Sequence, residues 1–118
     1  MAEVAQTNYR QDFGRIGMQI SDSLTPDEWK DVYRRLVYWE LELAQSSSPM
    51  SEMLAMQKEE ANQAFAKFVR RHYADWIQQS DERPMMSMDV FKKVVFPLLN
   101  EGQKVFLLVL DNFRYDQW

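Results

Sequence analysis

Turn-forming residues are scarce in this chain, and this scarcity limits its fold more than any other feature. Its 118 residues include only three Gly and four Pro. An all-β domain needs a turn every ~8–12 residues, and so few Gly and Pro cannot supply those turns. The sequence therefore predicts an all-α fold in which helices are joined by short connections.

Apolar side chains recur at helical spacing in three stretches, which predict a three-helix bundle. We expect helices at about residues 7–21, 25–44 and 50–78. Gly14 and Gly17 lie inside the first, so either this helix is weak alone or another backbone packs closely against it. The side chains expected on or near the inner faces are Tyr9, Phe13, Ile16, Ile20, Trp29, Val32, Tyr33, Leu36, Trp39, Glu40, Leu43, Met53, Leu54, Gln57, Ala61, Ala64, Phe65, Phe68, His72 and Trp76.

The clearest local signal marks the start of the second helix. Thr25 can cap this helix, and Pro26 suits its first position because proline lacks the N–H that would be unpaired there. Glu28 can bond back to Thr25 and complete a capping box. The second helix is therefore expected to begin at this point.

The pattern changes after the third helix. Residues 80–84 form a polar link, Ser87 is a candidate cap, and a shorter helix follows until Pro97 and Gly102 close it. Residues 105–110 are six consecutive apolar side chains, which are typical of a strand buried on both faces of a parallel sheet. No partner strand is encoded, so this part is expected to be the first helix and strand of a truncated α/β domain.

The expected organisation is a helical bundle at residues 1–79, with three helices and at most four, followed by a truncated α/β segment at 84–118. The second segment would contribute one helix and one apolar strand. Without a sheet, that strand should fold back on the bundle, pair with a second molecule or be disordered. The sequence leaves these three outcomes open.

Charge and side-chain chemistry exclude several classes of function. The net charge of −4 argues against direct binding of nucleic acid. The chain has no Cys and one His, which excludes disulfides, thiolate metal sites and paired imidazoles. The N-terminus lacks the features of a targeting segment, and no apolar run approaches the ~20 residues that span a bilayer. We therefore expect a cytoplasmic chain without membrane contact, and one that is not an enzyme by itself.

Asp111 is the main candidate site residue. It follows the apolar run directly, and ligands of open α/β sheets bind beyond the carboxyl ends of the strands, where a carboxylate can hold a metal ion. The alternative is a turn at Asp111 and Asn112 that caps a helix through Tyr115. Arg114 and Asp116 are more typical of surface charges, although Asp111 with Asp116 could form a weak metal site in the isolated chain.

Two further features have structural interpretations. His72 lies three residues before Asp75, but a metal site there would need another ligand such as Glu40 or Glu59, so a structural role for His72 is favoured. Four Trp and five Tyr exceed what a small bundle core needs. Some of these aromatic side chains are therefore expected at an interface with a second copy or with a further domain.

Residues 105–118 (VFLLVLDNFRYDQW) resemble the opening strand and motif of PglZ domains, a branch of the alkaline phosphatase superfamily. The similarity extends to PorX-type response regulators, which join a receiver domain, a helical middle domain and a PglZ domain. Residues 8–13 (NYRQDF), 32–42 (VYRRLVYWELE) and 56–62 (MQKEEAN) resemble that middle domain. Residues 91–99 (FKKVVFPLL) resemble the helix that leads into the PglZ domain.

The resemblance implies a two-component regulator associated with type IX secretion, with a zinc-dependent, phosphodiesterase-like effector domain. In that chemistry two metal ions polarise a phosphoryl group while a Ser or Thr attacks it. Only Asp111 maps onto this site, as the metal ligand from the first strand. Zinc is therefore expected in the full-length parent and not in the isolated chain, and no catalytic residue is expected in this segment.

The main hypothesis is a middle portion of such a regulator, which links receiver to effector and forms a homodimer. Its partners would be the receiver domain and the remainder of the PglZ domain, and phosphorylation would bias the packing of the bundle. The alternative is a free-standing helical interaction module without an enzymatic parent, whose last strand adds to a partner's sheet. The gene sequence on both sides of this segment would separate the two hypotheses.

Overall fold

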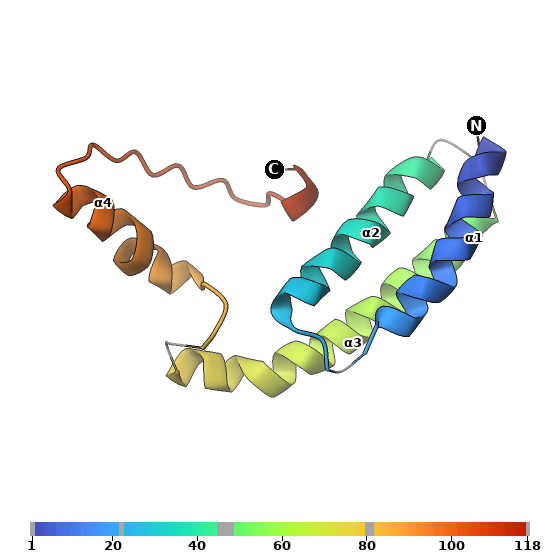
Figure 1. Cartoon of the computed structure of the whole chain (residues 1–118), viewed down its shortest axis with the longest axis horizontal. Helices are drawn as coiled ribbons and strands as arrows, with labels where there is room; N and C mark the ends of the chain where they lie inside the picture. Colours follow the sequence, from blue (N-terminus) through green and yellow to red (C-terminus); the bar gives the residue numbers. More distant parts are fainter. Residues whose placement is uncertain (1, 22, 45–48, 80–81, 118) are drawn as a thin grey trace. The chain divides into compact units, whose positions relative to one another are not determined.

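The computed structural model describes residues 2–21, 23–44, 49–79 and 82–117 (Figure 1). Within these ranges the chain forms helices and no strand, which confirms the all-α prediction. The chain divides into two compact units, Met1–Asp75 and Trp76–Trp118, which are described one at a time. The domain limits expected from the sequence, 1–79 and 84–118, stay a prediction.

The first unit contains the three expected helices. These are α1 (Ala2–Gln19), α2 (Pro26–Ala44) and α3 (Met50–Gln78), whose last turn belongs to the second unit. The bounds of α2 and α3 agree with the sequence pattern, whereas α1 begins several residues before the expected start. The periodic spacing of apolar side chains therefore located all three helices.

Each helix of the bundle contacts the other two through large side chains. Tyr9 of α1 lies against Trp39 of α2, with ring centroids 5.4 Å apart. Trp29 in the first turn of α2 packs edge-on against Phe65 of α3 at 5.3 Å and lies 6.0 Å from Phe68. The side chains with the least exposure are those of Tyr9, Ile16, Val32, Leu43 and Gln57, all from the predicted inner faces.

The start of α2 is a capping box, as the sequence predicts. The backbone N–H of Thr25 donates to the Glu28 carboxylate at 2.7 Å, and the N–H of Glu28 donates to the Thr25 hydroxyl at 3.3 Å. The Thr25 hydroxyl also donates to the same carboxylate at 2.8 Å. These bonds lower the pKa of Glu28, the backbone bond first and the hydroxyl bond second. The two residues thus satisfy N–H groups that a helix start leaves unpaired.

The two glycines of α1 have no close backbone neighbour. A Cβ at Gly14 would meet nothing within 4 Å, and a Cβ at Gly17 would meet only the Gln57 side chain, at 3.8 Å. Of the two explanations offered by the sequence, the close approach of another backbone is therefore wrong. Both positions carry the helix cost of glycine without a packing benefit.

The second unit continues with a helical run made of segments that differ in their hydrogen-bond spacing. It comprises a 3-10 turn η1 (Ser87–Asp89), a π turn η2 (Phe91–Val95) and α4 (Phe96–Asn100). In the π turn the N–H of Phe96 donates to the carbonyl of Phe91, five residues earlier. Proline inside a helix removes a hydrogen bond and clashes with the carbonyl four residues before it, so a wider turn ahead of Pro97 relieves this conflict.

Gly102 ends α4, as the sequence predicts, whereas Pro97, which was expected to close the helix with it, lies in the first turn of α4. Its φ is 76°, a left-handed conformation that glycine adopts without the strain of a Cβ. The N–H of Gly102 donates to the Leu99 carbonyl at 3.0 Å, and the N–H of Gln103 donates to the Leu98 carbonyl at 3.1 Å. This pair of bonds is a Schellman motif. At the other end, the cap expected at Ser87 is wrong by one residue, because Met86 occupies the capping position.

The expected apolar strand does not form in the described part of the chain. Residues 103–110 have no regular secondary structure, and the side chain of Phe106 is 87% exposed. A strand requires hydrogen bonds to a neighbouring strand, and the described residues contain no other strand that could supply them. That residues 105–110 pair within a sheet stays a prediction.

Candidate functional site

Asp111 begins a turn at the end of the exposed apolar segment. Its Oδ1 accepts a hydrogen bond from the backbone N–H of Asn112 at 2.9 Å. Asn112 has a φ of 55°, a left-handed conformation that asparagine tolerates better than most residues. The Asp111 side chain is exposed, so its carboxylate is accessible to a ligand.

The residues after this turn are held by their own side chains. Arg114 Nη2 donates to Asp116 Oδ2 at 2.8 Å, and the backbone N–H of Arg114 donates to Gln117 Oε1 at 2.9 Å. A short 3-10 helix, η3 (Tyr115–Gln117), follows. The turn considered from the sequence is therefore present, but Gln117 rather than Asp111 supplies the side-chain bond at the start of the helix.

Asp111 could supply one of the ligands that a zinc site needs. Protein-bound zinc takes about four N, O or S ligands. Among the residues that the structure describes, no group of three or more His, Cys, Asp or Glu side chains could hold a metal ion. Asp116, the second carboxylate considered from the sequence, is engaged by Arg114. Further ligands would have to come from other residues, and Asp111 as a metal ligand stays a prediction.

The sequence also raised the possibility of a metal site at His72. Among the described residues, His72 belongs to no group of three or more potential metal ligands. The ring of His72 lies 4.8 Å from that of Phe68, on the aromatic face of α3. Glu40 instead forms an ion pair with Lys58 at 2.8 Å, and Glu59 accepts a hydrogen bond from Gln63 at 3.0 Å. These contacts agree with a structural role for His72.

A buried amide joins α1 to α3 in the interior of the bundle. The Tyr9 hydroxyl donates to Gln57 Oε1 at 3.1 Å, and Gln57 Nε2 donates to the carbonyl of Phe13 at 2.9 Å. Beside them, Trp39 Nε1 donates to Asp12 Oδ2 at 2.8 Å. Burial and, secondarily, the nearby Asp12 charge raise the pKa of Tyr9 to about 12. This network joins α1 to both α2 and α3 in the interior of the bundle.

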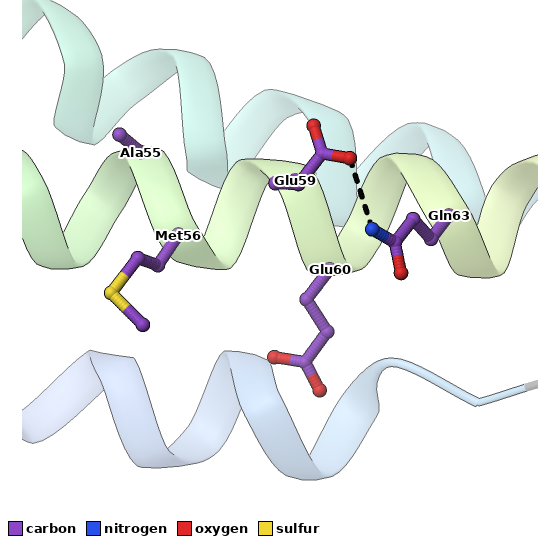
Figure 2. A pocket seen from close by; sticks show the side chains of 5 residues that line it. All are labelled: Ala55, Met56, Glu59, Glu60 and Gln63. Atoms are coloured by element: carbon purple, nitrogen blue, oxygen red, sulfur yellow. Dashed lines mark hydrogen bonds between the residues drawn. The ribbon is translucent and has the colours of Figure 1, made fainter.

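An open hollow of about 460 Å³ lies along α3 and is lined by Ala55, Met56, Glu59, Glu60 and Gln63. Figure 2 shows the side chains of Met56 and Glu60 directed from α3 toward α1, and the hydrogen bond between Glu59 and Gln63. All of the lining residues are exposed. The hollow therefore lacks the enclosure and the convergent polar groups of a catalytic pocket.

A group of polar contacts in the second unit lies at the start of its helical run. Arg83 donates to the carbonyl of Trp76 and forms a buried ion pair with Asp89. Asp89 Oδ2 accepts the backbone N–H of Met86 at 3.0 Å. This bond and the Arg83 guanidinium hold the pKa of Asp89 below its usual range. This pair was not predicted from the sequence, in which residues 80–84 have the character of a polar link.

Comparison with protein families explains the division of the chain. Residues 1–77 match the family model described as the PorX response regulator linker domain. The chain belongs to this family. Residues 90–118 match a second model, described as the BREX system PglZ alkaline phosphatase-like domain. No curated protein matches the chain significantly.

These matches confirm the resemblance seen in the sequence, for the helical part and for the PglZ segment. Asp111 and the turn after it lie inside the PglZ match, and the Arg83–Asp89 pair lies between the two matches. No helix among the described residues is both long enough and apolar enough to cross a membrane.

Proposed function

We propose that this chain links the receiver domain of a cytoplasmic two-component regulator, associated with type IX secretion, to a PglZ phosphodiesterase-like effector domain. The observation that carries the proposal is the order of two family matches along one chain, the PorX linker at 1–77 and the PglZ segment at 90–118. A linker of this kind works through its packing, and the described part of the bundle has a core of buried side chains from all three helices.

We also propose that the bundle forms a homodimer whose association responds to phosphorylation of the receiver. Exposed apolar side chains on α2 support this proposal. Tyr38 is 54% exposed and Leu41 is 59% exposed, and their spacing of three residues puts them on one side of the helix. Apolar and aromatic side chains are typical of the centre of protein interfaces.

Sedimentation velocity of the full-length regulator, with and without a phosphoryl mimic such as beryllofluoride, tests this relay. The mimic should raise the dimer fraction of the natural protein, and Leu41→Glu should abolish that rise by placing a charge in the apolar contact. Glu42→Gln changes the next residue, which is also exposed, and serves as the matched control. The same oligomer with and without the mimic would show that the relay does not work through dimerisation.

Asp111 is proposed to supply one ligand of the zinc site in the complete PglZ domain. Its accessible carboxylate supports this role, and when zinc is bound it would polarise the phosphoryl group of a substrate. In a protein that contains the whole PglZ domain, Asp111→Asn should lower both the zinc content and phosphodiesterase activity. Asp116→Asn should retain zinc, because Asp116 is engaged by Arg114. Retention of zinc by Asp111→Asn would refute the assignment.

The rival function is a free-standing interaction module that adds a strand to a partner's sheet. The apolar segment at residues 105–110, in which residues 106–110 are exposed, is the observation in its favour. Translation of the gene on both sides of the segment decides the question. A receiver domain before it and further α/β motifs after it would eliminate the rival, and their absence would eliminate the proposed regulator.

A further inference from the structure

Residues 78–89 connect the two family matches, and a buried ion pair between Arg83 and Asp89 lies within this connection. We propose that Arg83 and Asp89 form a clasp that makes this junction a stiff coupler rather than a flexible tether. The clasp is defined as the Arg83 guanidinium with its two partners, the Asp89 carboxylate and the Trp76 carbonyl. It concerns the junction alone and holds whether or not the chain dimerises.

The guanidinium joins the end of one helix to the beginning of the next. Nη1 donates to the carbonyl of Trp76 in the last turn of α3, where carbonyl groups have no partner within the helix. A cation is also favoured there by the helix dipole. Nη2 bonds to Asp89 Oδ1 at 2.5 Å, and Asp89 lies in η1. A single side chain therefore ties together two helix ends that the sequence separates.

Burial distinguishes the clasp from the ion pairs at the protein surface. The side chains of Arg83 and Asp89 are only 5% and 9% exposed. Arg34 and Asp31 of α2 are 56% and 57% exposed in a pair of similar geometry, at 3.0 Å. Exposed pairs contribute little to stability, whereas loss of one partner from a buried pair leaves an uncompensated charge. We therefore expect the buried Arg83–Asp89 pair to stay formed, whereas the exposed Arg34–Asp31 pair should open and bond with water instead.

The local sequence favours a stiff connection as well. Pro84 follows Arg83, and a proline restricts both its own φ and the backbone of the residue before it. No glycine occurs between residues 78 and 89, so the connection has none of the Gly-rich character of flexible linkers. Asp89 is fixed in addition by the N–H of Met86. Both partners of the ion pair are thus held in place before they meet.

The chain contains no cysteine, so spin labels can be attached at chosen positions without altering the background. We would label Gln78→Cys at the end of α3 and Asn100→Cys at the end of α4, both exposed and both in the second unit. Electron paramagnetic resonance would then measure the distance distribution between the labels. Dilution with unlabelled chain restricts the measurement to pairs within one protomer.

The clasp predicts one narrow distance distribution in the otherwise natural chain. Arg83→Ala and Asp89→Asn should each broaden it at least twofold, and the matched surface variant Arg34→Ala should leave it unchanged. Arg83→Lys keeps the positive charge, but the lysine ammonium lacks the planar guanidinium that donates to both partners at once. This variant should therefore also broaden the distance distribution. If Arg83→Ala loses its helical circular dichroism signal, and with it the fold, the milder Arg83→Lys variant serves as the test. A broad distribution in the natural chain, or an unchanged width in Arg83→Lys, would overturn the proposal.

Discussion

At the scale of single residues, the interior of the bundle is organised by one amide. Gln57 accepts from the Tyr9 hydroxyl and donates to the Phe13 carbonyl, so its oxygen and its nitrogen both have partners on α1. A buried polar group that loses its partner bears the cost of desolvation. Gln57 therefore specifies how α1 sits against α3 in a way that an apolar side chain would not.

Removal of the Tyr9 hydroxyl tests this interpretation. Tyr9→Phe keeps the ring contacts with Trp39 and leaves Gln57 Oε1 without its donor, so the free energy of unfolding should fall by about 1–3 kcal/mol. Urea unfolding followed by circular dichroism measures the difference. Tyr38→Phe makes the same chemical change at an exposed position and should have little effect. Equal effects of the two substitutions would contradict a special role for the buried hydroxyl.

The same hydroxyl predicts a pH dependence. Burial raises the pKa of Tyr9 from 10.0 to about 12, so between these pH values the unfolded chain binds fewer protons at this residue than the folded chain. The stability that depends on Tyr9 is therefore fully present below pH 10 and is lost as the pH rises toward 12. Across this window the free energy of unfolding should fall more steeply with pH for the natural chain than for Tyr9→Phe. Parallel curves would show that Tyr9 titrates normally.

The sequence located these residues but not their contacts. Tyr9 and Gln57 were both predicted on the inner faces, because helical spacing identifies the side of a helix that is buried. Their hydrogen bond depends on how far α1 is shifted along α3, which no local pattern encodes. Arg83 and Asp89 are six residues apart across a non-helical link, a spacing without any helical or strand signature, and were missed for that reason.

At the scale of secondary structure elements, local signals at helix ends were the most informative. The capping box at Thr25 and Glu28 and the closing glycine at Gly102 both form as predicted. Such signals involve residues that are close in the sequence, so tertiary packing is not needed to bring them together. The start of α1 has no comparable signal, and its predicted position was correspondingly the least accurate.

Two glycine substitutions are predicted to have opposite effects. Gly14→Ala should stabilise the bundle by up to about 1 kcal/mol, because Gly14 lies in α1 with open space where a Cβ would be. Gly102→Ala should destabilise the end of α4 by roughly 1–2 kcal/mol, because its φ of 76° strains a side chain. Thermal unfolding checks the first substitution, and hydrogen exchange of the Gly102 and Gln103 amides checks the second. Stabilisation by Gly102→Ala would contradict the assigned cap.

At the scale of the whole molecule, apolar surface is concentrated in the second unit. The exposed large apolar side chains there are Ile77, Met85, Met88, Phe91, Val94, Phe96, Leu99, Phe106, Leu107, Leu108, Val109, Leu110 and Phe113. Large apolar side chains that stay exposed in such numbers are typical of surfaces that contact another molecule. An extended apolar segment with free backbone groups can also pair with another chain. These features favour self-association through residues 105–110.

We therefore expect concentration-dependent self-association of this chain in sedimentation velocity experiments. Leu108→Glu should reduce it by at least threefold in association constant, because the charge would have to be buried in the contact. Gln103→Glu adds the same charge at an exposed position just before the apolar segment and should change the constant much less. If both variants associate like the natural chain, the contact lies elsewhere. The surface of the bundle that includes Leu41 would then be tested next.

The limits of sequence analysis at this scale are physical. Residues 105–110 carry the apolar character of a central strand, and the PglZ match includes them. A strand is nevertheless defined by hydrogen bonds to its neighbours, so the residues themselves can encode a preference but cannot supply the pairing. Asp111 has the same limitation, because one carboxylate is only one possible ligand and a complete metal site would need several more.

The π turn before Pro97 has a geometric consequence for everything that follows it. Each residue of an α-helix advances the chain by about 100° around the axis, so one extra residue in η2 shifts the phase of α4 by that angle. Uniform spacing would group Phe91 and Val94 with Val95 and Leu98, yet the first two are exposed and Val95 is buried. Deletion of one residue from η2 would barely shorten the segment, but it would turn Leu98 through more than a quarter of a revolution. The direction in which α4 presents its side chains is thus encoded by residue count as much as by residue type.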